Sequence, residues 1–157
     1  MRKGQAAMEF LMTYGWAILV VLVAIGALAY FGVLSPEQFL PEKCTISTGS
    51  GLFCIDHSAV GGTADAITLR TQNILTDSVT IAVGGATVSF TGSDGTAETC
   101  TNNAALTLTA DQTDNLVLDT CTGLAVGEKV KGDISITYTK AGGLTKTTTG
   151  SLVTVAG

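Results

Sequence analysis

The pattern of apolar and polar positions divides the chain into two parts of different character. Residues 10–34 contain no charged side chain, and residues 18–23 are apolar without a break. At about 1.5 Å per residue, a helix of this length crosses the hydrocarbon core of a bilayer. Because the segment is apolar on every side, no face suits water, and we expect the helix to be buried in lipid or in protein.

Alternating apolar and polar residues follow this run and continue to the end of the chain. The clearest alternation, over residues 133–139, is followed by the turn sequence Ala141-Gly142-Gly143 and by a second alternation over residues 151–155. Period-two alternation on both sides of a glycine turn is typical of paired antiparallel strands. The pattern therefore predicts a long C-terminal β-hairpin.

Shorter segments of the same type precede the hairpin, at residues 66–70, 79–83, 87–90, 106–109 and 116–118. Gly84-Gly85 is expected to form a tight turn between the second and third of them. Roughly seven short strands with no amphipathic helix among them are typical of an antiparallel sandwich. The sequence therefore predicts an α+β chain, in which a long hydrophobic helix precedes a small antiparallel β-sandwich of the Ig-like type.

Capping residues mark the end of the apolar helix. Ser35 suits an N-cap, Pro36 suits the first helical position, and Gln38 stands where a capping box reaches back. We therefore expect the helix to restart or to kink at this point. Pro41 then ends it, because proline cannot continue a helix.

Composition and charge narrow the range of functions. The 157 residues are enough for one small domain beside the helix. Only 13% of residues are charged while 46% are hydrophobic, which excludes a disordered chain and indicates a link to a membrane. The net charge is −5, and basic residues occur only in small groups such as Arg2-Lys3. Binding to phosphates needs clustered Lys and Arg, so no nucleic acid is expected as a partner.

The apolar segment has two ordinary interpretations, and neither accounts for all of it. A secretory signal fits the basic start and Ala27-Leu28-Ala29, but the apolar run is longer than the usual ~7–15 residues. A plain membrane anchor fits the length but does not explain Glu9. A carboxylate at the centre of a membrane helix costs about 2.5–3.5 kcal/mol. Glu9 therefore needs a partner unless its side chain reaches the headgroups.

The residues before the apolar run favour a third interpretation. A basic pair precedes Gly4, Glu9 stands four positions after Gln5, and the string Gln-Ala-Ala-Met-Glu-Phe leads into the apolar helix. This arrangement closely resembles the class III signal of type IV prepilins, and the string resembles its archaeal form. Gln5 stands where bacterial members commonly carry Phe, which favours the archaeal branch.

The resemblance implies a division of the chain into three parts. A membrane-embedded prepilin peptidase would cut on the cytoplasmic side between Gly4 and Gln5, and the helix would be retained. Residues 1–4 are then a cleaved leader, and residues 5–41 a hydrophobic transmembrane and filament-core helix. Residues 42–157 form an extracellular β-sandwich domain.

Such a cut changes the charges near Glu9. It removes Arg2 and Lys3 and creates an α-amine on Gln5 that is largely protonated at neutral pH. The amine can pair with Glu9 of its own chain or with Glu9 of a neighbouring subunit. The resemblance implies the second pairing, which fixes an axial stagger between subunits and is stronger when desolvated. Cyclisation of the N-terminal Gln would remove the charge of the amine.

The four cysteines, Cys44, Cys54, Cys100 and Cys121, all lie in the part predicted to be outside the membrane. An even number in such a chain implies disulfides, and four cysteines allow three pairings. Sequence neighbours, Cys44–Cys54 and Cys100–Cys121, are the simplest choice. Cys54 and His57 also have zinc-like spacing, but no second pair of ligands repeats it, so disulfides are favoured.

Enzyme chemistry and cofactors have little support in the sequence. Asp56, His57 and Ser58 are the residue types of a catalytic triad, but adjacent residues in an extended chain point in alternating directions. Asp94-Gly95 matches a hairpin turn and is only a weak calcium candidate. We therefore expect a protein without catalytic residues, a bound metal or a cofactor.

The sequence thus favours a structural subunit of an extracellular type IV pilus-like filament, most similar to archaeal adhesion pili. Its expected partners are identical subunits, the prepilin peptidase and assembly machinery, and the cytoplasmic membrane before assembly, with the N-terminus inside. Threonine-rich strand faces suit lateral packing and O-linked glycans. The alternatives are a membrane-anchored or secreted monomeric β-sandwich binding module, or an archaellin-like subunit.

Overall fold

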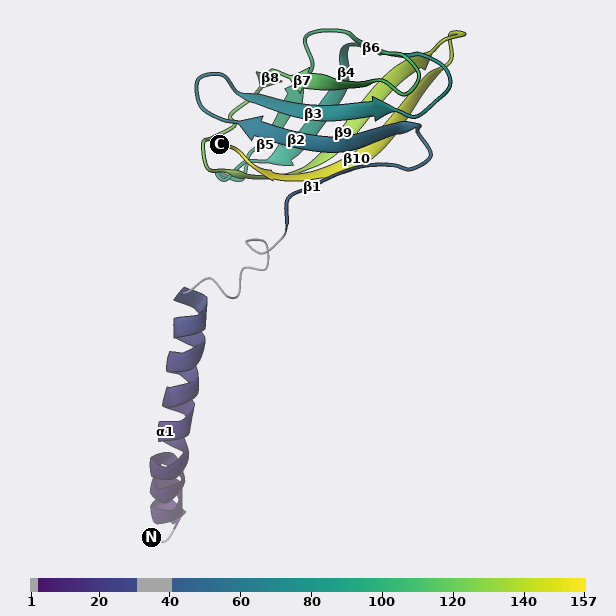
Figure 1. Cartoon of the computed structure of the whole chain (residues 1–157). Helices are drawn as coiled ribbons and strands as arrows, with labels where there is room; N and C mark the ends of the chain where they lie inside the picture. The colour runs from purple at the N-terminus through teal and green to yellow at the C-terminus, as the bar shows by residue number, and fades with distance from the viewer. Residues whose placement is uncertain (1–2, 31–40) are drawn as a thin grey trace. The chain divides into compact units, whose positions relative to one another are not determined.

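The structure is a computed structural model, and it describes residues 3–30 and 41–157 (Figure 1). Its contacts separate two units, Met1–Leu40 and Pro41–Gly157, which are described one at a time. Side chains of the first unit are described from Ala7 onward. The helix restart or kink predicted at Ser35–Gln38 lies outside the described residues, as does the start of the predicted leader.

The first unit contains one helix, α1 (Lys3–Tyr30). Its segment Ala7–Tyr30 is long and apolar enough to cross a membrane, and none of it is buried inside the molecule. The large side chains therefore stand fully outside a core, as Trp16 shows with 71% of its surface exposed. The predicted apolar helix is confirmed over these residues. Thr13 fits the helix interior because its hydroxyl donates to the Glu9 carbonyl at 2.8 Å.

The second unit is a β-sandwich-like domain, and residues 41–157 include no helix. Its strands are β1 (Lys43–Ile46), β2 (Leu52–Val60), β3 (Ala66–Asn73), β4 (Val79–Thr91), β5 (Ala97–Thr101), β6 (Leu106–Leu108), β7 (Thr113–Leu118), β8 (Thr120–Cys121), β9 (Lys129–Lys140) and β10 (Thr145–Val155). The larger sheet has the order β1-β10-β9-β4-β5-β8, with β6 also paired to β4, and the smaller sheet is β2-β3-β7 (Figure 1). The strands within both sheets pair antiparallel. The α+β prediction is therefore confirmed.

Alternation of side chains along the strands builds the core of this domain. Ile134 and Ile136 of β9 and Ile67 and Leu69 of β3 are all almost completely buried. Each such side chain contributes about 1.5–3 kcal/mol by leaving water. Tyr138 is also buried, and its hydroxyl donates to the Ser50 carbonyl at 2.5 Å, so its polar atom is satisfied inside the core.

The C-terminal hairpin forms as the alternation predicts. Strands β9 and β10 pair from Thr139↔Thr145 to Lys129↔Val155. The turn between them contains Gly143, whose φ of +86° is a conformation that side chains with a Cβ rarely adopt. Lys140 closes the turn, because its N–H donates to the Leu144 carbonyl at 3.0 Å.

The tight turn expected at Gly84-Gly85 is wrong, because β4 continues through both glycines. The register of β4 against β9 shifts between Ile81 and Ala86, which is the mark of a β-bulge. Asn102 holds the bulge: its side-chain amide donates to the Ala82 carbonyl at 2.8 Å and its side-chain oxygen accepts from the Ala86 N–H at 2.8 Å. The two segments expected as separate strands are therefore one long strand.

Two disulfides join strands, and the described residues contain no free cysteine. Cys44–Cys54 connects β1 of the larger sheet to β2 of the smaller one, and Cys100–Cys121 connects β5 to β8. These are the pairings of sequence neighbours expected above. Each closes a short loop and is worth roughly 3 kcal/mol on the loop-entropy estimate. The zinc alternative fails, because the Cys54 sulfur is bonded to Cys44.

Candidate functional site

The N-terminal residues singled out by the sequence lie on α1. Gly4, Gln5 and Glu9 are all within the helix, so Gln5 and Glu9 are one turn apart and share a helix face. Glu9 is exposed and is the only charged residue of the Ala7–Tyr30 segment. A cut after Gly4 would leave the new amine one helical turn from this carboxylate.

Large apolar side chains are exposed along the whole of the described part of α1 from Met8 onward. Met8 and Phe10, which flank Glu9, are each 63% exposed, and the exposed apolar side chains continue to Tyr30. Such a surface cannot remain in water, so lipid or other helices must cover it. Covering it with other helices also removes water from Glu9, which then requires a counter-charge.

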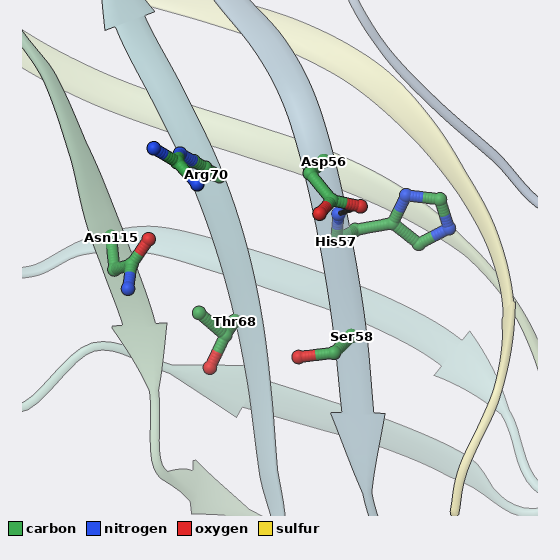
Figure 2. Close-up of a pocket in the computed structure, with 6 residues that line it drawn as sticks. All are labelled: Asp56, His57, Ser58, Thr68, Arg70 and Asn115. Atoms are coloured by element: carbon green, nitrogen blue, oxygen red, sulfur yellow. Dashed lines mark hydrogen bonds between the residues drawn. The ribbon is translucent and has the colours of Figure 1, made fainter.

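The triad-like residues of β2 do not form a catalytic chain. Figure 2 shows Asp56 and Ser58 on one side of the strand, while the imidazole ring of His57 points to the other side. The Asp56 carboxylate accepts from the backbone N–H of His57 at 2.8 Å, and not from its ring. Alternation along the strand thus separates the groups that a triad needs to align.

A shallow hollow of about 200 Å³ lies beside these residues on the smaller sheet. Its lining is polar and comes from three strands: Asp56, His57, Ser58, Thr68, Arg70 and Asn115 (Figure 2). Arg70 stands opposite Asp56 on β2 and Asn115 on β7 in the strand register. The lining therefore combines the Arg70 guanidinium and the Asp56 carboxylate with hydroxyl and amide groups, and a free guanidinium can bind a carboxylate. Sequence reasoning missed this cluster because it is assembled across strands.

The turn between β4 and β5 contains Asp94, the weak calcium candidate. The predicted hairpin turn is confirmed, with the Gly95 N–H donating to the Gly92 carbonyl at 2.9 Å. One Asp94 oxygen accepts from the Thr96 hydroxyl at 2.6 Å and from its N–H at 2.9 Å. These bonds lower the pKa of Asp94. Among residues 3–30 and 41–157, no three His, Cys, Asp or Glu side chains are arranged to hold a metal ion.

Two buried glutamates near this turn were not predicted. Both oxygens of Glu128 accept backbone N–H groups, one from Ser93 and one from Ala125. Glu98 is 8% exposed, and its Oε2 is buried without a hydrogen-bond partner in the described structure. Gly123 leaves room for Glu98, since an added Cβ there would collide with its carboxylate. Sequence reasoning missed Glu98 because its polar neighbours conceal which face of β5 is inside.

The environment of Glu98 raises its pKa. Burial is the main cause, and the negative charges of Glu128, Asp94 and Asp65 add to it. A raised folded-state pKa means that the stabilising contribution of Glu98 is present below its ordinary pKa and is lost as the pH rises through the raised value. The ionised group therefore destabilises the domain at neutral pH.

We expect Glu98→Gln to raise the melting temperature at pH 7 by about 2–5 °C and to change it little near pH 4, where wild-type Glu98 is already largely protonated. Thermal unfolding of the full chain in detergent, followed by circular dichroism at both pH values, measures this. Glu42→Gln is the matched control, because Glu42 is exposed. An equal change at both pH values, or a lower melting temperature at pH 7, would contradict the assignment.

Comparison with models of known protein families gives no match, and comparison with curated proteins also gives no match. The family resemblance therefore depends on the residues around Gly4, Gln5 and Glu9 and on the apolar helix that follows them.

Proposed function

We propose that the chain is a structural subunit of an extracellular type IV pilus-like filament of the archaeal adhesion type. Its α1 helices pack in the filament core, and its β domains form the outer sheath. The observation that carries this proposal is the segment Ala7–Tyr30, an apolar helix with no buried side and one charge, Glu9, one turn from Gln5. A plain anchor does not need that charge.

The chemistry of the helix supports assembly through its whole length. In the membrane, lipid covers the apolar surface, and Arg2 and Lys3 keep the N-terminus on the cytoplasmic side. In a filament, neighbouring helices replace the lipid and bury the same surface. A protonated Gln5 amine on one subunit then neutralises Glu9 of the next, which gives each incoming subunit one axial position.

The β domain supports a location outside the cell. Its two disulfides join strands and persist in an oxidising environment. The outer face of its larger sheet is rich in threonine, as expected for a surface that carries O-linked glycans. If the class III signal is cut after Gly4 and the helix is retained with its N-terminus on the cytoplasmic side, the β domain lies on the outer side of the membrane.

A second candidate, a membrane-anchored or secreted monomeric binding module, is favoured by the polar hollow around Arg70 (Figure 2). In that case the ligand site, and not the helix, is the functional part. An archaellin-like subunit would share the helix-core arrangement and differ in the machinery that rotates the filament. The N-terminus of the protein separates the first two candidates.

The test is to recover the protein from its own cells and determine its N-terminus by mass spectrometry, with electron microscopy of the sheared surface fraction. We expect a chain that begins at Gln5, free or cyclised, and filaments that contain it. An N-terminus at Tyr30 would indicate a secreted domain, and one at Met1 would indicate a plain anchor. Either of these results would refute the proposal.

A further inference from the structure

The two outer faces of the β domain differ in what they can bind. On the larger sheet, many outward hydroxyls already pair with each other. The pairs are Thr45 with Ser151 at 2.8 Å, Thr80 with Thr107 at 3.1 Å, Thr137 with Thr147 at 3.0 Å, and Thr139 with Thr145 at 3.2 Å. A face whose polar groups satisfy one another gains little from a protein partner.

The outer face of the smaller sheet has a different composition. Four large apolar side chains are exposed on its edge strands: Phe53 at 50%, Ile55 at 52%, Val60 at 49% and Val117 at 42%. Arg70 lies between them on the central strand β3, and β2, β3 and β7 contain no Lys or Glu. Aromatic and Arg residues with little Lys or Glu are typical of the centre of a protein interface. We call this surface, made of Phe53, Val60, Arg70, Asn115 and Val117, the Arg70 face.

The Arg70 side chain is exposed, and its guanidinium has no hydrogen bond or ion pair with another described residue. Figure 2 shows its guanidinium turned away from Asp56, its neighbour on β2. Acidic residues outnumber basic ones over residues 42–157, and Asp94, Asp111 and Asp119 are exposed. An identical copy therefore offers the carboxylates that an unpaired guanidinium binds best.

The Arg70 face has a small area, which limits the conditions under which such a contact is stable. Strand β3 has 8 residues. At about 3.3 Å per residue and about 4.8 Å between strands, the three-stranded face covers roughly 400 Å². A stable complex usually buries about 800 Å² on each partner, so this face is too small to hold two free domains together. It becomes effective only where another contact already keeps the copies close.

We propose that the Arg70 face is a lateral contact between β domains of neighbouring subunits, with Arg70 bound to carboxylates on a different surface of the second copy. This inference rests on the proposed filament, because helix packing supplies the proximity that the small area requires. Contacts between two different surfaces form an open helical array when the rotation between copies does not close a ring, which suits a filament.

The test uses the full chain in its own cells, with the photo-cross-linker p-benzoylphenylalanine in place of Val117. Thr107, which is exposed on the larger sheet, is the matched control position. Illumination of intact cells is expected to give a subunit–subunit product from position 117 at least about fivefold above position 107. Illumination after the subunits have been dissolved and diluted in detergent is expected to give no such product. Position 53, where phenylalanine is already present, repeats the measurement if the variant at 117 does not fold.

Charge substitutions at Arg70 complete the experiment. In the cross-linking background, Arg70→Glu should reduce the product at least about fivefold, while Arg70→Lys keeps most of it. Filaments without the product, or equal products from positions 117 and 107, would overturn the contact and leave the filament intact. The product without filaments would refute the proposed function and the dependence of the contact on helix packing. Loss of both would refute both.

Discussion

Replacing Gly4 with valine is expected to leave a full-length membrane protein and to abolish filaments. A peptidase cleft that accepts the residue before the cut admits glycine most easily, because glycine has no Cβ. Valine adds a branched side chain at that position. The uncut chain keeps Arg2 and Lys3, so its apolar helix stays anchored in the membrane with its charged end on the cytoplasmic side.

The measurement combines mass spectrometry of the N-terminus, immunoblots of membrane and surface fractions, and filament counts by electron microscopy. Gly49→Val is the matched control, since Gly49 lies in the β domain with nothing within 4 Å of an added Cβ. This control should be cut and assembled like the wild type. Normal filaments from Gly4→Val would remove the prepilin interpretation.

The sequence predicts those elements whose pattern is local. The apolar run predicts α1, and alternation on both sides of Gly142-Gly143 predicts the β9–β10 hairpin. Strand β2 was missed because a bulge between Cys54 and Asp56 interrupts its alternation. The interpretation of Gly84-Gly85 failed because the bulge there depends on Asn102, which is distant in the sequence.

Among the candidate sites too, the sequence identifies the residues that are close together along the chain and misses those that only the fold brings together. Gln5 and Glu9 are visible in the sequence because four-residue spacing is one helical turn. Glu98 and Arg70 are not visible in the sequence. The burial of Glu98 and the lack of a side-chain partner for Arg70 both depend on which strands lie beside them. Pairing of Cys44 with Cys54 was accessible, since the short separation favours closure of a small loop.

Glu9→Gln separates two roles of the carboxylate more clearly than any other change in the chain. If Glu9 only extends to the headgroups, the substitution removes one charge at the membrane edge and leaves assembly intact. If Glu9 pairs with the Gln5 amine of a neighbouring subunit in a dry helix bundle, the substitution leaves that amine buried without a counter-charge. Such a charge typically costs about 3–5 kcal/mol, which is enough to prevent stable docking of each new subunit.

We therefore expect Glu9→Gln to be inserted and cut after Gly4, because the peptidase acts before assembly, and then to accumulate as unassembled membrane subunits. Filament counts and immunoblots of the membrane fraction are measured together for the wild type, this variant and Glu42→Gln, which removes an exposed charge outside the apolar helix. The control should assemble normally. Wild-type filament numbers from Glu9→Gln would rule out the pairing even in a protein that forms filaments, since the helix surface alone would then be sufficient to position the subunits.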